Sequence, residues 1–128
     1  MPVEVHVVTP EREVWSGPAE MVIARGVAGE VGILEGHAPL LIQLAVGPLR
    51  IQGAGDTPEL RAVVDGGFMH VTSGDDGTRV DVMASQAELE SEIDFERAAR
   101  ELRDLEGRDD DEAAIALARA RARTNLRG

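Results

Sequence analysis

The sequence predicts a mostly β protein with an α appendage: an N-terminal antiparallel β-sandwich followed by a C-terminal antiparallel α-helical hairpin. Two observations lead to this prediction. From residue 3 to residue 83, short apolar stretches alternate with Gly, Pro, Asp and Ser, and no helical segment separates them. Near Gln86 the apolar residues change from a period of two to helical spacing. We therefore expect a sandwich domain at residues 1–86 and a helical hairpin domain at residues 87–128.

The β half begins with a clear alternation of apolar and polar residues at positions 3–7, VEVHV. Further candidate strands are residues 13–15, 19–25, 31–34, 40–44, 48–52, 60–64, 67–72 and 79–83. Turn residues lie between them, among others at positions 16–18, 47–48 and 65–67. Many short strands at close spacing favour a sandwich or a barrel.

The α half contains two amphipathic segments, for which we expect helices at residues 88–105 and 110–124. In the first segment, apolar residues such as Leu89, Ile93 and Leu102 recur at helical spacing between Glu, Asp and Arg. Either Ser85 or Ser91 can cap its start. Gly107 can end it, and the short connection that follows makes the two helices antiparallel neighbours.

Composition excludes several classes of function. The net charge is −11 and the sequence has three aromatic residues, so neither a basic patch nor a base-stacking surface is expected and nucleic acid is a poor ligand. The same charge disfavours direct binding to an anionic membrane. The chain has no cysteine. No signal peptide or spanning segment is visible, so we expect contact with a membrane only through a partner.

The candidate catalytic and metal-binding residues do not form a recognisable site. The three histidines, His6, His37 and His70, lack the spacing of a zinc site, and we predict no metal. The serines fall in turn or cap contexts, without the strand–turn–helix setting of a nucleophile. We predict no catalytic residues and no required cofactor.

The most distinctive segment is GEVGILEGHAPL at residues 29–40, in which three glycines precede or flank His37. This segment resembles the glycine-histidine-alanine-proline-leucine signature of the epsilon subunit of bacterial F-type ATP synthases, which translocate protons. Other blocks agree in order and spacing: VHVVTP at 5–10, WSGPAEMV at 15–22, VDGGFMHV at 64–71, VDVMASQAE at 80–88 and IDFERA at 93–98. The resemblance covers the whole chain.

The resemblance implies a sandwich of about ten strands and a hairpin that regulates the enzyme. It implies that the chain binds the gamma subunit in the central stalk, rests on the ring of c subunits and carries no catalytic site. The extended hairpin would reach the alpha and beta subunits and inhibit ATP hydrolysis. The loop around Glu30, Gly36 and His37 would face the c ring. The location implied is peripheral, at the cytoplasmic face of the cell membrane.

The IDFERA segment also matches a pattern that binds ATP in some bacterial members of this family. The residues that fit this nucleotide site are Glu88, Ile93, Asp94, Arg97, Arg119 and Arg123. Guanidinium groups suit phosphate, and a carboxylate can accept from an adenine amine or a ribose hydroxyl. One further arginine of the pattern is replaced by Asp104. The same residues would equally form ordinary ion pairs on a solvated helix face.

Two other functions stay open at this point. One is a standalone soluble module in which the hairpin senses ATP. The other is a sandwich enzyme, which would need clustered ligands or paired acids on facing strands. A stalk subunit would co-purify with a gamma partner through an apolar patch on the sandwich, whereas a soluble sensor would not.

Overall fold

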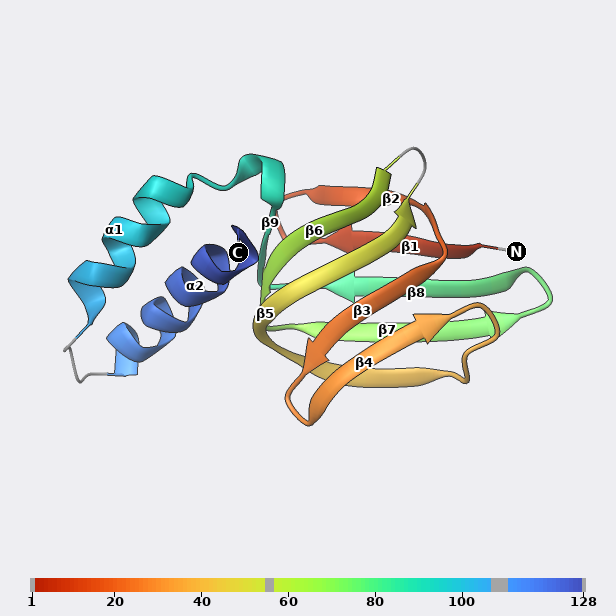
Figure 1. The fold of residues 1–128 in the computed structure, drawn as a ribbon. Helices are drawn as coiled ribbons and strands as arrows, with labels where there is room; N and C mark the ends of the chain where they lie inside the picture. Colours follow the sequence, from red (N-terminus) through yellow and green to blue (C-terminus); the bar gives the residue numbers. More distant parts are fainter. Residues whose placement is uncertain (1, 55–56, 107–110, 128) are drawn as a thin grey trace.

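The structure is a computed structural model that describes residues 2–54, 57–106 and 111–127. A β-sandwich is followed by two α-helices that lie beside it (Figure 1). The strands are β1 Val3–Val8, β2 Glu13–Ala19, β3 Met21–Gly26, β4 Gly29–Leu34, β5 Leu40–Ala54, β6 Thr57–Asp65, β7 Phe68–Gly74, β8 Gly77–Met83 and β9 Gln86–Leu89. A 3₁₀ turn, η1 Glu90–Glu92, leads to α1 Phe95–Leu105 and α2 Asp111–Arg127. The fold class expected from the sequence is confirmed.

The sandwich consists of two sheets that share strand β5. The first sheet has the order β2-β1-β8-β7-β5, and the second has β4-β3-β5-β6-β9. The pairs are antiparallel with one difference from the expectation, because β1 runs parallel to β8, with Val5 opposite Val80. Among the described residues there are nine strands.

The turn expected at residues 47–48 is wrong, because both residues lie within strand β5. Its first residues, Leu40 to Gln43, pair with β7, and Gly47 onward pair with β6 in the other sheet. The glycine and proline therefore lie where the strand passes from one sheet to the other, and pairing with β6 continues through both. The turn expected at residues 16–18 is also wrong. These residues belong to β2, an edge strand, where a proline without an N–H is tolerated.

The core lies between the two sheets and is built mainly from aliphatic side chains. Alternate residues of each strand point inward: Val3, Val5 and Val7 of β1 are at most 1% exposed. The largest fully buried side chains are Ile33, Leu49, Ile51 and Met69, together with eight valines. The period of two that predicted the strands is therefore the period of burial.

The α half begins later than expected. Gln86–Leu89 form β9, which pairs with β6 so that Ala87 lies opposite Val64 and Leu89 opposite Ala62. Ala87 and Leu89 are two residues apart and both contact the sandwich core. This segment also fits helical spacing, but it forms a strand because it can pair with the free edge of β6. The expected boundary between residues 86 and 87 thus falls inside β9.

Helix α1 begins at Phe95 instead of residue 88, and its N-cap is Asp94, not Ser85 or Ser91. The Asp94 carboxylate accepts a hydrogen bond from the backbone N–H of Arg97 at 3.0 Å. Gly107, expected to end this helix, lies outside the described residues. Within the described ranges, neither helix has the length and apolar character needed to span a bilayer.

We predict that Gly67→Ala destabilises the sandwich strongly. Gly67 has φ +97°, and a Cβ there would lie 2.1 Å from the carbonyl oxygen of Met83. Backbone strain and overlap together should lower the free energy of unfolding by at least about 2 kcal/mol. Urea unfolding of both proteins measures the difference. Gly74→Ala is the control, because nothing lies within 4 Å of its Cβ position. Equal midpoints for the two variants would contradict the prediction.

Candidate functional site

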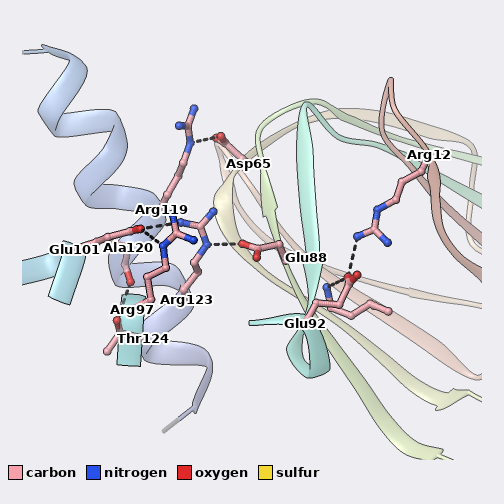
Figure 2. Close-up of polar contacts among 11 residues, drawn as sticks. Arg12, Asp65, Glu88, Glu92, Arg97, Glu101, Arg119, Ala120, Arg123 and Thr124 are labelled. Carbon is pink, nitrogen blue, oxygen red and sulfur yellow. Dashed lines mark hydrogen bonds and ion pairs between the residues drawn. The ribbon is translucent and has the colours of Figure 1, made fainter. Parts of the chain in front are cut away.

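The hairpin contacts the outer face of the second sheet through two arginines of α2. Arg119 and Arg123 are one helical turn apart and point to the same side (Figure 2). The Arg119 Nε donates to Asp65 Oδ2 at the end of β6, and the Arg123 Nε donates to Glu88 Oε1 on β9. The side chains of Asp65 and Arg123 are 14% and 24% exposed, so these ion pairs are partly shielded from water.

A small apolar cluster completes this contact. Ile93, just before α1, and Leu126, near the end of α2, pack on Val63 of β6. Val63 points outward from the sheet, yet it is 5% exposed because the hairpin covers it. The hairpin is thus held by a few apolar side chains beside two ion pairs.

A cavity of about 260 Å³ lies beside these contacts, between α1, α2 and β9. Its lining consists of Glu88, Glu92, Asp94, Arg97, Ala98, Glu101 and Arg123. Four of the six residues expected to bind a nucleotide, Glu88, Asp94, Arg97 and Arg123, are therefore brought together. The other two are not part of this lining. Ile93 belongs to the apolar cluster and Arg119 extends to Asp65.

The lining of this cavity carries a net negative charge, because it holds four carboxylates and two guanidinium groups. Both arginines have carboxylate partners. Arg97 Nε lies 3.1 Å from Glu101 Oε1, and Arg123 Nη1 lies 3.8 Å from Glu101 Oε2 (Figure 2). A phosphate would have to replace these carboxylates to bind here. Asp94 already serves as the cap of α1.

The linker between the two halves is clamped on both sides. Arg61 of β6 makes a bidentate ion pair with Glu90, at 2.8 and 2.7 Å. On the other side, Glu92 accepts hydrogen bonds from Arg12 Nη2 at 2.8 Å and from the Leu89 N–H at 2.9 Å. The Arg12 hydrogen bond, with that of Leu89, holds the pKa of Glu92 below its usual 4.5. The chain is thereby fixed up to residue 92.

The residues expected to face the c ring do not form one loop. Glu30 lies near the start of β4, beside the β3–β4 turn, whereas Gly36 and His37 follow the other end of that strand. The Gly36 N–H donates to Thr78 Oγ1 at 2.7 Å, and the Ser73 hydroxyl donates to the His37 carbonyl at 2.6 Å. The start of the β4–β5 connection, at Gly36 and His37, is therefore anchored to the β7–β8 hairpin.

The three histidines lie on three different elements, and His6 and His70 are separated by strand β8, where both lie opposite Asp81. His6 lies on β1, His70 on β7 and His37 in the β4–β5 connection. His6 Nε2 lies 3.3 Å from Glu4 and its Nδ1 lies 3.6 Å from Glu13. In the described ranges, no group of three or more His, Cys, Asp or Glu residues is arranged to hold a metal ion.

Sequence reasoning missed Asp65, Glu101 and the residues of the linker clamp. Asp65 precedes two glycines and was interpreted as a turn residue, although its carboxylate binds Arg119. Arg12 and Glu92 are separated by 80 positions. Their proximity follows from the pairing of β9 with β6, which no local pattern specifies.

A β-sandwich with a docked helical hairpin, joined by ion pairs on a sheet face, defines a class of small two-part protein. The family model described as "ATP synthase, Delta/Epsilon chain, beta-sandwich domain" matches residues 2–90. The chain is 48% identical to the ATP synthase epsilon chain of Thermobifida fusca over 124 residues, 96% of this chain and 88% of that protein. It is 43% identical to the epsilon chain of Mycolicibacterium smegmatis over 120 residues, covering 93% and 91%.

Among solved structures, the chain is similar to one in the Euglena gracilis mitochondrial ATP synthase, OSCP/F1/c-ring. The TM-score is 0.82 with 26% identity, over 99% of this chain and 82% of that one. A chain of the Tetrahymena thermophila mitochondrial ATP synthase central stalk/c-ring has the same fold, with a TM-score of 0.68, 17% identity and coverage of 100% and 98%. The chain belongs to the family of ATP synthase epsilon chains. It is therefore a non-catalytic subunit of an ATP synthase, and the sandwich-enzyme interpretation is set aside.

We predict that Arg12→Ala raises the pKa of Glu92 toward 4.5, because the hydrogen bond from Arg12 is the main cause of its lowering. A carboxylate with a lowered pKa stabilises the folded state above pH 4.5. This contribution is lost as the pH falls through the lowered value. NMR titration of the Glu92 carboxyl carbon measures the pKa of Glu92 in the unmodified chain and in Arg12→Ala. Glu11→Ala is the control for a charge change in the same turn, and an unchanged Glu92 titration in Arg12→Ala would contradict the assigned cause.

Proposed function

We propose that the chain is a coupling and regulatory subunit in the central stalk of a rotary, proton-translocating F-type ATP synthase. In this role it links the gamma subunit to the c ring, at the cytoplasmic face of the cell membrane. Its hairpin inhibits ATP hydrolysis when it extends to the alpha and beta subunits. Support comes from family membership and from the similarity to a chain of the Euglena gracilis mitochondrial ATP synthase assembly OSCP/F1/c-ring.

The observation that carries the regulatory part is the narrow contact between hairpin and sandwich. Each of the buried side chains Val63, Ile93 and Leu126 contributes about 1.5–3 kcal/mol at most. The ion pairs of Arg119 and Arg123 are partly exposed, and such pairs contribute about 0–1 kcal/mol each. Ordering the hairpin opposes these terms. A modest interaction elsewhere can therefore displace the hairpin, as a movable inhibitor requires.

An apolar patch on the first sheet supports a protein partner. Leu41, Phe68 and Met83 are 63%, 50% and 42% exposed. Phe68 lies opposite both Gln43 of β5 and Met83 of β8, so the three side chains share the outer face of neighbouring strands. Exposed aromatic and methionine side chains are enriched at protein interfaces. We assign this patch to the gamma subunit, and the anchored segment with Gly36 and His37, or the β3–β4 turn with Glu30, to the c ring.

ATP is proposed as a regulatory ligand of the cavity between α1, α2 and β9. The supporting observation is that Glu88, Asp94, Arg97 and Arg123 line one space, although they come from three elements. Bound phosphate would exchange Glu101 for a ligand oxygen on Arg97 and Arg123. ATP would then hold the helices together in the docked arrangement. The same chemistry, without partners, describes the alternative of a standalone ATP-sensing module.

We predict that removing residues 93–128 relieves inhibition of ATP hydrolysis in the assembled enzyme. A deletion from residue 87 would remove most of β9 and open the edge of β6, so the cut must follow η1. The truncated sandwich should keep its folding and its affinity for gamma, because the core lies between the sheets. Hydrolysis assays of the reconstituted enzyme and a gamma pull-down measure the two effects. Equal hydrolysis rates with and without the hairpin would remove the inhibitory role while leaving the coupling role.

We predict that Arg97→Ala and Arg123→Ala each weaken ATP binding by about tenfold, since each loses a charge-assisted hydrogen bond to phosphate. Calorimetric titration of the isolated subunit with ATP measures the affinity. Arg121→Ala is the matched control, because Arg121 is exposed on the same helix and is not part of the cavity lining. A silent titration of the unmodified chain would exclude ATP as its ligand. Failure to retain gamma in a pull-down would instead favour the standalone sensor.

A further inference from the structure

A second cavity, of about 330 Å³, lies on the other side of α2, between this helix and the outer face of the second sheet. Its lining consists of Arg25, Pro48, Arg50, Glu59, Arg61, Ala122, Asn125 and Leu126. The lining has three arginines and one carboxylate, in a chain whose net charge is −11. This is the reverse of the acidic cavity beside α1. We call it the basic pocket.

The three arginines come from three adjacent strands of one sheet. Arg50 of β5 lies directly opposite Arg61 of β6, and Arg25 of β3 lies on the other side of β5. Like charges directly opposite one another on antiparallel strands are destabilising. Glu59 and Glu90 offset two of them, since Glu59 Oε1 lies 2.8 Å from Arg50 Nη2 and Glu90 Oε1 lies 2.7 Å from Arg61 Nη2. Within the described part of the chain, no ion pair involves Arg25.

The backbone is shaped to accommodate Arg25. The register of β3 against β5 shifts here, because Ala24 lies opposite Leu49 and Gly26 opposite Leu44. The extra residues belong to β5, so Arg25 lies beside the stretch in which β5 passes from one sheet to the other. On the neighbouring strand, Gly47 leaves room for the arginine stem. A Cβ at Gly47 would lie 3.2 Å from Arg25 Cδ and 3.6 Å from its Nε. The passage of β5 between the sheets and a glycine thus leave room for Arg25 at the edge of a cavity, and no ion pair among the described residues involves it.

We propose that the basic pocket binds a phosphate-bearing small anion and that the bound anion holds α2 against the second sheet. Arg25 supplies a guanidinium that can bind phosphate oxygens without breaking an ion pair with any described residue. Arg50 adds charge from the next strand. Asn125 provides an amide from α2, so a ligand here contacts both the sandwich and the helix. Binding at a site formed only in the docked state would stabilise that state by mass action.

This site is separate from the cavity proposed for ATP. It shares none of its lining residues with that cavity, although both use α2 as a wall. The proposal therefore does not depend on ATP binding by Arg97 and Arg123. A nucleotide and free inorganic phosphate offer the same phosphate chemistry, and the two are distinguished by titrating each separately.

The test is NMR titration of the full-length chain with inorganic phosphate and, separately, with ADP. We expect saturable shifts in the amides of β3, β5 and the end of α2. Arg25→Gln should weaken binding by about tenfold, and it breaks no ion pair among the described residues. Arg79→Gln on the first sheet should not change the affinity, because Arg79 lines neither of the two cavities beside α2. Tighter binding of ADP than of phosphate would identify the ligand as a nucleotide, and equal affinities would identify phosphate.

Amide hydrogen exchange tests the second half of the proposal. Saturating anion should slow exchange in α2 of the unmodified chain and should leave exchange unchanged in Arg25→Gln. Unchanged affinity in Arg25→Gln, or shifts that do not saturate, would overturn the site. Weaker binding only in Arg97→Gln would overturn it too, and would support the ATP cavity instead. Saturable binding without slower exchange in α2 would overturn the coupling to the hairpin.

Discussion

Strand β5 belongs to both sheets, and the arrangement of the rest of the molecule depends on this sharing. Its first residues extend the first sheet beside β7, and its later residues form the centre of the second sheet between β3 and β6. One chain segment thereby fixes the distance and the angle between the two sheets, and the aliphatic core fills the space between them. Because β6 pairs along β5, the sharing also places β9, the linker and the hairpin.

The contact between hairpin and sandwich contrasts with that core. Among the described residues, the sandwich core holds 20 buried hydrophobic side chains, most of them placed by the alternation of the strands. The hairpin covers one outward-facing valine with a few apolar residues. Beside them, Arg119 and Arg123 form ion pairs with Asp65 and Glu88 (Figure 2). The linker before it is clamped by arginines on both sides up to Glu92. A rigid β half, a fixed linker and a weakly held hairpin are the mechanical parts that a coupling subunit with a movable regulator needs.

Charge is distributed unevenly around α2. On the side of α1, carboxylates outnumber arginines, and each arginine already has a carboxylate partner. On the side of β3 and β5, arginines outnumber carboxylates, and the Arg25 side chain lies beside Gly47. The cavity on the α1 side of α2 therefore repels an anion, whereas the pocket on the side of β3 and β5 attracts it. The electrostatics favour binding on the basic side, and the family pattern points to the acidic side.

The sequence by itself determined the sandwich and the hairpin, because alternate burial along a strand and helical spacing along an amphipathic segment are local periods. It also predicted the family, since the GHAPL block and its neighbours extend along the whole chain. Predictions from local patterns were wrong where pairing with a strand distant in the sequence decides the structure of a segment. Gln86–Leu89 became a strand because the edge of β6 was open, and residues 47–48 continued a strand because β5 crosses between sheets.

The candidate site shows the same division. Helical spacing placed Arg119 and Arg123 on one face, and the IDFERA block placed Asp94 and Arg97 one turn apart. Only the tertiary structure decided that Arg119 binds Asp65, that Ile93 is buried on Val63, and that Arg25, Arg50 and Arg61 share a pocket. Each of these contacts joins residues far apart in the chain. Their proximity is set by strand register and by the docking of a helix on a sheet, neither of which any single segment encodes.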